Sequence, residues 1–230
     1  MAKRMKDFGF WIAAIFLLAH PVFSEPAALP KEAQQALEKT AAWKNYKADF
    51  TLDAKEEDGK TFQLRGTMIF QKPERRRLEI REGDAKETTQ LLVSDGRVEW
   101  QYYPKNHAAY RINQPPEAPG PHRPFEEVKP ESVRFVQRVE GPEPLLRFEG
   151  EPLPKSVEGS PVPIRRVRLD VSEKDGMLRE LVMLDEQGNP ALTQRFTHVE
   201  LDVSVPAGQF TFTPPEGVSV TEAPAAAKED

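Results

Sequence analysis

Apolar and polar residues alternate through stretch after stretch of this 230-residue chain, and turn sequences separate the stretches. The first example is YKADFTLDA, residues 46–54, which is followed by a turn at Asp58-Gly59 and by TFQLRGTMIF, residues 61–70. An alternation with a period of two gives a strand one apolar face, and Asp-Gly is a turn that joins antiparallel neighbours. The pattern predicts a meander of hairpins whose apolar face is kept away from water.

The strand pattern is interrupted in the middle of the chain. Twelve prolines lie between Pro115 and Pro163, and proline removes backbone donors from a strand ladder. We expect a proline-rich loop insert over residues 115–163, with a short helix at residues 131–139 and a short strand in LLRFEG, residues 145–150. Alternation resumes after the insert, and neither half offers much core alone. The pattern therefore favours one interrupted domain over two small ones.

The two ends of the chain have a different character. MAKRMK, followed by the apolar FGFWIAAIFLLA and by HPVFS, has the order of a secretory signal peptide, which we predict over residues 1–24. An uncleaved amphipathic anchor is the alternative. The spacing of apolar residues in LPKEAQQALEKTAAWKNY predicts one helix from Leu29 to about Asn45. We expect a single domain over residues 25–220 and a disordered tail over residues 221–230.

Composition limits the location and the partners of the chain. It has no cysteine, so it carries no disulfide, no thiolate ligand and no lipid-anchoring cysteine. Together with the signal sequence, this favours a soluble monomer in the periplasm. The formal net charge of −5 becomes more negative when the basic leader is removed, and it argues against nucleic acid as a partner. The basic stretches ERRRLEIR and RRVR are interpreted as exposed strand faces rather than anion sites.

No catalytic motif stands out in the sequence. Outside the leader, histidine occurs at His107, His122 and His198 only, and none has a second ligand at zinc spacing. There is no G-x-S-x-G elbow, no phosphate-binding loop and no paired carboxylates in an apolar setting. We therefore expect no enzymatic activity, no cofactor and no metal.

The apolar sheet face is the feature that needs an explanation. One helix covers only part of a large curved sheet, and two alternatives stay open. The first is a barrel filled by its own side chains, and the second is a barrel with unfilled apolar volume that holds a ligand. Gly66 and Ala108, which are small residues on otherwise bulky faces, favour room inside.

Three segments resemble the family of periplasmic carriers of outer-membrane lipoproteins, the LolA-like family. They are GTMIFQKPERRRLEI, LLVSDGRVEWQYYP and the closing FTFTPPEGV. LRELVMLDEQGNPALTQRFTHVELDVSVPAGQF also resembles the penultimate hairpin of that family, and the likeness spans residues 29–220 except for the proline-rich middle. The resemblance implies a mainly β (α+β) fold, namely an incomplete, strongly curved antiparallel β-barrel with an N-terminal helix and lid elements over its open end.

The resemblance also implies a function. The chain would bind the acyl chains of lipoproteins, or of another lipid such as a glycolipid, in an apolar cavity. It would receive them from an inner-membrane ABC transporter and deliver them to an outer-membrane receptor. The residues expected to line the cavity, some of them packed against the helix instead, are Phe50, Phe62, Leu64, Met68, Phe70, Leu78, Ile80, Leu92, Trp100, Tyr102, Phe148, Leu169, Met183 and Phe196.

One position departs from the family pattern. The family usually has Lys-Arg-Pro before the third strand, and that arginine contacts the lid, whereas this chain has Gln71-Lys72-Pro73. Lysine lacks the planar fork that binds several carbonyl groups at once. The lid and release contact is therefore expected from Lys72, or from Arg75 or Arg76 in its place.

Two other functions remain as hypotheses. Related folds act as envelope-stress sensors that bind mislocalised lipoprotein and regulate a protein partner. Such sensors usually carry an additional C-terminal domain, whereas this sequence stops soon after the closing motif, which favours the carrier. An enzyme acting on lipid esters is the third hypothesis, and it would need a polar residue whose loss abolishes turnover.

Overall fold

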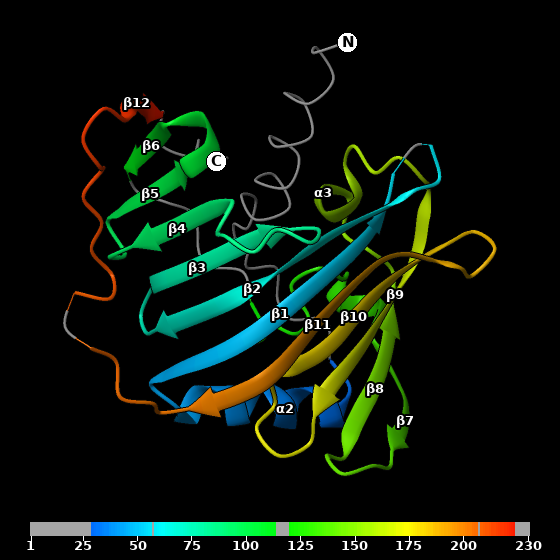
Figure 1. Cartoon of the computed structure of the whole chain (residues 1–230). Helices are drawn as coiled ribbons and strands as arrows, with labels where there is room; N and C mark the ends of the chain where they lie inside the picture. The colour runs from blue at the N-terminus through cyan, green and yellow to red at the C-terminus, as the bar shows by residue number, and fades with distance from the viewer. Residues whose placement is uncertain (1–28, 57, 114–119, 207, 224–230) are drawn as a thin grey trace.

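The computed structural model describes residues 29–56, 58–113, 120–206 and 208–223 (Figure 1). The predicted signal peptide lies outside them. The helices and 3₁₀ turns are α2 (Lys31–Ala42), η1 (Pro104–Asn106), η2 (Pro130–Ser132) and α3 (Pro154–Val157). The strands are β1 (Asn45–Lys55), β2 (Thr61–Gln71), β3 (Arg75–Glu82), β4 (Gln90–Ser94), β5 (Val98–Tyr103), β6 (Ala108–Asn113), β7 (Arg134–Val139), β8 (Leu145–Gly150), β9 (Ile164–Ser172), β10 (Leu178–Asp185), β11 (Pro190–Leu201) and β12 (Ser219–Ala223).

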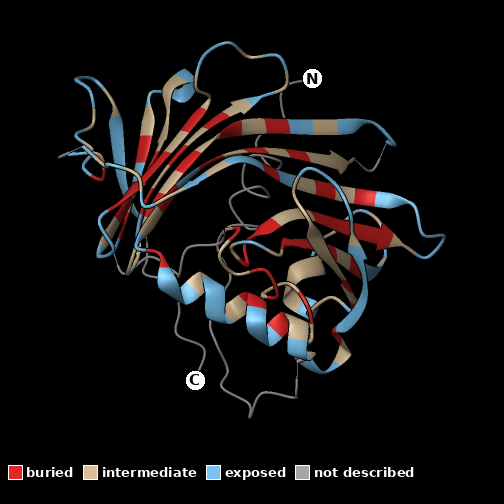
Figure 2. Cartoon of the chain, turned by 90° about the horizontal axis from the view of Figure 1, so that it is seen from below, coloured by how far each residue is buried: buried red, intermediate tan, exposed pale blue. Residues whose placement is uncertain are grey.

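All of the described strands belong to one sheet in the order β12-β6-β5-β4-β3-β2-β1-β11-β10-β9-β8-β7. Neighbours are antiparallel except β12, which runs parallel to β6. β1 pairs with β11, so the strands before and after the proline-rich middle join side by side. The sheet is open and strongly curved, with α2 on its concave side (Figures 1 and 2). This is the architecture that the resemblance to the LolA-like family predicts, and the prediction of fold class is confirmed.

The hairpin turns follow from their Asp and Gly residues. Gly59, Gly96 and Gly176 all have positive φ, between 75° and 90°, which glycine adopts without a steric penalty. At the second of these turns, the Asp95 carboxylate accepts hydrogen bonds from the backbone N–H groups of Arg97 and Val98, both at 2.8 Å. The aspartate thus satisfies the donors of the turn, and the glycine supplies its backbone geometry.

The helix prediction is confirmed over a shorter range. α2 covers Lys31–Ala42 and ends before Trp43, whose backbone is extended (φ −83°, ψ 161°). Asn45 already pairs with Gln71 in the sheet. The apolar spacing continues past Ala42, but strand pairing fixes the backbone of the residues that follow.

The middle of the chain contains more strand than predicted. The expected helix over residues 131–139 is wrong: Pro130–Ser132 forms a 3₁₀ turn and Arg134–Val139 forms the edge strand β7. Phe135 pairs with Phe148 of β8, so pairing with a neighbour overrides the local pattern. The strand predicted in LLRFEG is confirmed as β8.

The tail prediction is wrong at its first residues. Thr221–Ala223 belongs to β12, where Thr221 pairs with Tyr110 and Ala223 with Ile112. Residues 224–230 lie outside the described part of the chain. Pairing with an exposed sheet edge gives these polar residues backbone partners that their composition does not indicate.

Arg166 and Arg168 of RRVR lie on the outer face of the sheet, as predicted, whereas Val167 is buried on the inner face. Arg168 lies 3.4 Å from Glu180, whose carboxylate also binds Arg195 at 2.7 Å. The neighbouring Arg147 forms a paired hydrogen bond to Asp170, with both N···O distances at 2.7 Å. Ion pairs with these neighbouring acids neutralise the arginines.

Candidate functional site

The inner face of the sheet, defined as the face toward α2, is apolar over β8–β11, β1 and β2. Strand register shows which side chains share it: Phe196 pairs with Phe50, Leu169 with Phe148, and Met68 with Leu78. These side chains are at most 3% exposed and belong to one core cluster that also contains Ala33 and Ala36 of α2. The inner face, its helix and the segment described below form the candidate site.

α2 lies against this face with small side chains. The fully buried residues of the helix are Ala33 and Ala36, and Leu29 and Leu37 pack against the same cluster while partly exposed. A Cβ atom added to Gly176 would stand 2.0 Å from the carbonyl oxygen of Ala36. The helix backbone therefore rests directly on the β9–β10 turn.

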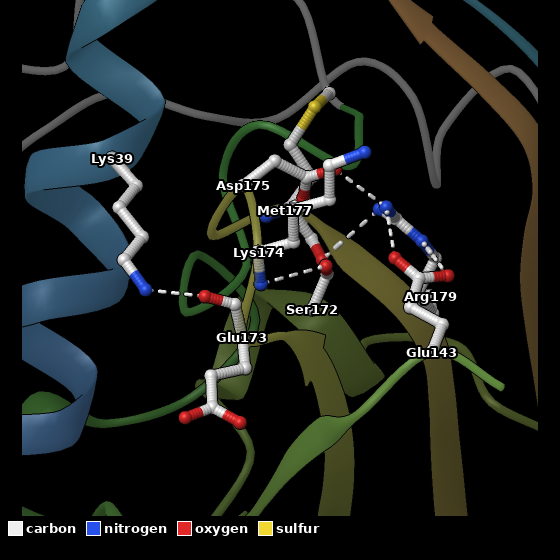
Figure 3. Close-up of polar contacts among 8 residues, drawn as sticks. All are labelled: Lys39, Glu143, Ser172, Glu173, Lys174, Asp175, Met177 and Arg179. Carbon is white, nitrogen blue, oxygen red and sulfur yellow. Dashed lines mark hydrogen bonds and ion pairs between the residues drawn. The ribbon is translucent and has the colours of Figure 1, made fainter. Parts of the chain in front are cut away.

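The β9–β10 turn, on which α2 packs, is held in place by ion pairs. The Arg179 guanidinium donates hydrogen bonds to Glu143 and Asp175, both at 2.6 Å (Figure 3). Lys39 of α2 reaches across and donates to the carbonyl oxygen of Glu173. Arg179 of β10 thus ties the turn to Glu143 of the β7–β8 connection, and Lys39 of the helix adds a further contact to the turn.

Lys72 holds the C-terminal end of α2. Its ammonium nitrogen donates to the carbonyl oxygens of Thr40 at 2.9 Å and Ala41 at 3.1 Å. The same nitrogen lies 4.0 Å from the centroid of the Trp43 ring, within cation–π range. Partial burial lowers the pKa of Lys72, although Asp202 acts in the opposite direction. A cation at a helix C-terminus is favourable because it satisfies free carbonyl groups and opposes the helix dipole.

Replacing Lys72 by methionine should loosen this end of α2. Methionine keeps most of the apolar stem but removes both hydrogen bonds and the cation, which together contribute about 1–2 kcal/mol. We expect faster amide hydrogen exchange in the last turn of α2, with exchange in β9 and β10 unchanged. Lys72→Arg is the matched control, since it keeps the charge and the donors. Unchanged exchange in the methionine variant would show that Lys72 does not hold the helix.

The first described residues of the proline-rich insert, 120–133, also lie on the inner face. We call residues 120–133 the plug segment. Phe125, Val128 and Val133 of this segment are buried in the core cluster, and the Phe125 ring meets Phe148 edge-on at 5.1 Å between centroids. The backbone N–H of Leu178 donates to the carbonyl oxygen of Pro121 at 2.7 Å. The insert therefore covers the sheet as well as linking two of its parts.

The plug segment places His122 inside an aromatic cluster. The His122 ring stacks on Phe70 at 4.3 Å and lies 5.9 Å from Trp43. Its Nδ1 atom is 3.0 Å from the hydroxyl of Tyr46. Burial, followed by the charges of Arg123, Lys72 and Arg76, lowers the pKa of His122 to about 3. The imidazole is therefore neutral near neutral pH.

The inner face becomes polar over β3–β5. The residues of this polar cluster are Arg76, Gln90, Ser94, Glu99, Gln101 and Tyr103. Arg76 donates from Nε to Glu99 at 2.7 Å, and Gln101 donates to the other oxygen of the same carboxylate at 2.9 Å. Gln90 donates to the hydroxyl of Tyr103 at 2.9 Å. Arg76 and Glu99 are 3% and 1% exposed, so this is a buried ion pair.

The structure places most of the predicted cavity residues together on the inner face. Their lining of a lipid cavity stays a prediction, and in the structure they belong to the core cluster that also contains residues of α2 and the plug segment. Phe62 is half-buried and the others are buried. These residues are Phe50, Phe62, Leu64, Met68, Phe70, Leu78, Ile80, Leu92, Phe148, Leu169, Met183 and Phe196.

The prediction is wrong for Trp100 and Tyr102, which lie on the outer face. Leu92 of the inner face pairs with Gln101, so the neighbours of Gln101 on β5 point to the opposite side. Phe212 covers them there, with ring centroids at 5.8 Å and 5.4 Å from the two aromatic rings. Phe212 belongs to the closing FTFTPPEGV motif, which passes along β3–β6 before β12 (Figure 1). The aromatic residues do share one face, but it is the outer face, where a segment distant in sequence partly covers them.

Two further expectations need correction. Gly66 leaves no room inside the sheet, because an added Cβ would stand 2.9 Å from the Phe50 ring and 2.0 Å from the Glu79 carbonyl oxygen. Arg76 is not on an exposed strand face but in the buried polar cluster. Arg75 is exposed, and the side-chain contact to α2 from this region comes from Lys72.

Sequence reasoning misses His122, Glu99 and Gln101. His122 follows a proline-rich, loop-like stretch, which favours a surface or ordinary packing histidine. Glu99 and Gln101 alternate with the aromatic residues of β5, and their polarity indicates an outward face. The pairing of Leu78 with Leu92, and of Leu92 with Gln101, is the signal that corrects the face, and only the register supplies it.

Two structural features are absent among the described residues. None of their helices is long and apolar enough to cross a membrane. The same residues contain no group of three His, Cys, Asp or Glu side chains placed to hold a metal ion.

A protein of known structure shares this fold, and two others match most of this chain with lower TM-scores. An uncharacterized conserved protein from Thermus thermophilus superposes with a TM-score of 0.60 at 14% identity, over 84% of this chain and 100% of that chain. A LolA superfamily protein, NE2245 from Nitrosomonas europaea, matches at 13% identity and a TM-score of 0.36, covering 78% and 97%. A chain of the Pseudomonas aeruginosa MucA/MucB complex matches at 14% identity and a TM-score of 0.46, covering 79% and 60%. No protein-family model and no curated protein matches the sequence.

Proposed function

We propose that this chain is a periplasmic carrier that binds the acyl chains of lipoproteins, or of a related lipid, on the inner face of its sheet. The observation that carries the proposal is the way in which α2 covers that face. The helix buries the side chains of two alanines fully, whereas the opposing sheet residues are large and apolar. Small side chains hold a cover in place weakly, because the free energy of burial follows the apolar area removed from water.

Acyl chains replace such a cover favourably. Each buried methylene is worth about 0.8 kcal/mol, so an acyl chain with about ten methylenes on the inner face contributes about 8 kcal/mol. The alanine methyl groups of α2 contribute about 1–2 kcal/mol by the same rule, and the partly buried Leu29 and Leu37 add about 2 kcal/mol. The acyl chain also has to displace part of the plug segment, whose Phe125 and Val128 are buried on the same face. The difference between the two burial free energies is available for this displacement. Binding therefore replaces the contacts of α2 and the plug segment with the inner face by contacts between that face and the acyl chain.

The contacts that keep the cover closed are polar and local. Lys72 binds the end of α2, Tyr46 binds His122, and the Leu178 amide binds Pro121. Each such bond contributes about 1 kcal/mol net. Opening also exposes the buried Phe125 and Val128, so the bound acyl chain has to offset both the hydrogen bonds and this apolar burial. We further propose that an inner-membrane ABC transporter loads the carrier and an outer-membrane receptor unloads it.

Mass spectrometry of the protein purified from the cell envelope under native conditions tests this function. We expect a co-purifying acylated molecule, and we expect Phe62→Gln to reduce its amount because the half-buried Phe62 lies on the inner face opposite Ala54. Trp100→Ala is the matched control and should leave the amount unchanged, because Trp100 lies on the outer face. Purification without any lipid, together with capture of a membrane-anchored regulatory protein, would instead support the stress-sensor function.

A further inference from the structure

The inner face changes from apolar to polar within each row of paired residues. Phe70 pairs with Arg76, which pairs with Ser94 and then Glu99. One row along, Leu78 pairs with Leu92 and then Gln101. The first polar residue is Arg76 of β3 in the first row and Gln101 of β5 in the second. The polar cluster therefore lies directly beside the apolar part of the face. A molecule lying across the strands meets hydrocarbon at one end and hydrogen-bonding groups at the other.

Stability alone gives little reason for this polar cluster. Burying Arg76 and Glu99 removes both charges from water, and the attraction between them only roughly offsets that cost. Apolar side chains of similar volume serve as well or better in such positions. The neighbouring inner-face positions of β1 and β2 are filled in that way, by Phe50, Met68 and Phe70. The polar side chains at these positions therefore call for a functional explanation.

The charges of the cluster indicate which ligand group it suits. Glu99 accepts from Arg76 at 2.5 Å, so the guanidinium is already neutralised. A phosphate or carboxylate entering here would face the Glu99 carboxylate in a buried setting, which is strongly unfavourable. The remaining groups are the amides of Gln90 and Gln101 and the hydroxyls of Ser94 and Tyr103, which both donate and accept. This inventory matches a neutral group that also donates and accepts, as hydroxyls do.

We propose that the polar cluster is the headgroup subsite of the carrier and selects a neutral, hydroxyl-bearing headgroup such as a sugar. This inference rests on the proposed function, since the acyl chains of the same ligand would occupy the apolar part of the face. Gln101 and Gln90 exchange their present partners, Glu99 and Tyr103, for ligand hydroxyls. The buried Arg76–Glu99 pair keeps its own contact and positions the carboxylate as an acceptor.

A binding assay with three lipids of identical acyl chains tests the subsite. They are a monoglucosyl diacylglycerol, the diacylglycerol itself and the phosphatidic acid, each titrated against the full-length protein as a competitor of a fluorescent fatty acid. We expect the sugar lipid to bind about tenfold more tightly than either of the others, a ratio equivalent to about 1.4 kcal/mol. Gln101→Leu and Gln90→Leu should each bring the ratio to within about twofold, with the affinity for diacylglycerol retained.

The control variant is Gln63→Leu, because Gln63 is exposed on the outer face of β2, opposite Asp53 and away from both parts of the binding face. It should keep the wild-type preference. Equal binding of the three lipids to the wild type, or a preference that survives both polar-cluster variants, overturns the headgroup subsite and leaves the carrier function standing. Binding of none of the three lipids, with no displacement of the fluorescent fatty acid, overturns the proposed function itself. Preferred binding of phosphatidic acid shows that the cluster takes anions and also overturns the subsite.

Discussion

Gly176→Ala is expected to destabilise the protein by about 3 kcal/mol and to detach α2 from the sheet. Gly176 has φ +75°, which costs an alanine about 1–2 kcal/mol. The added Cβ would also stand 2.0 Å from the Ala36 carbonyl oxygen, a contact that real Cβ atoms do not make. Arg179, Glu143 and Asp175 brace the turn, so the helix has to move. Chemical denaturation measures the first effect, and hydrogen exchange in α2 measures the second.

Gly188→Ala is the matched control for this prediction. Gly188 lies in the next hairpin turn with φ +82°, and an added Cβ would meet nothing closer than Arg166 at 4.0 Å. The variant should lose about 1 kcal/mol from backbone strain, with exchange in α2 unchanged. If both variants lost the same stability and kept α2 equally protected, the helix would not depend on the β9–β10 turn for its position.

Lowering the pH from 6.5 toward 3 should release the plug segment through His122. The pKa of this residue is lowered from 6.5 to about 3 in the folded protein, chiefly by burial. The unfolded chain binds the proton first as pH falls, so the stability is fully present above pH 6.5 and is lost progressively below it. The loss amounts to about 3 kcal/mol by about pH 4. Protonated His122 would also meet Lys72, Arg76 and Arg123, which are all cationic.

Urea denaturation at a series of pH values checks this prediction with His122→Phe as the variant. Phenylalanine keeps the ring that stacks on Phe70 but does not titrate. We expect the variant to lose the part of the pH dependence that the wild type shows as the pH falls below 6.5. His198→Gln is the control, because His198 is 79% exposed and lies outside the aromatic cluster. An unchanged slope in His122→Phe would show that this histidine does not couple protonation to the fold.

The hairpins and the helix could be predicted because their signals are local. Alternation, Asp-Gly turns and the spacing of Ala33, Ala36 and Leu37 each act over a few residues. β7 could not be predicted in this way, since its pairing with β8 across a short turn decides its conformation. The open, curved sheet follows from the resemblance to a family and not from the periodicity itself.

The site could be predicted only in its apolar part. Met68, Leu78 and Leu92 fall on one face by alternation and are found there. Trp100 is expected on that face because the resemblance to the LolA-like family implies that the alternating aromatic residues line the cavity. It lies on the other side instead, where Phe212 of the closing motif partly covers it. A sequence shows that a strand has two faces, but the register with its neighbours decides which one faces inward.

The carrier function depends on acyl chains taking the place of α2 and the plug segment on the inner face. Hydrogen exchange measured with and without a bound acyl lipid tests this most directly. We predict faster exchange in α2 and at the Leu178 amide, which donates to Pro121, and unchanged or slower exchange in β1 and β2. Lipid binding that leaves α2 and the Leu178 amide as protected as before would contradict this function, because the lipid would then bind elsewhere on the protein.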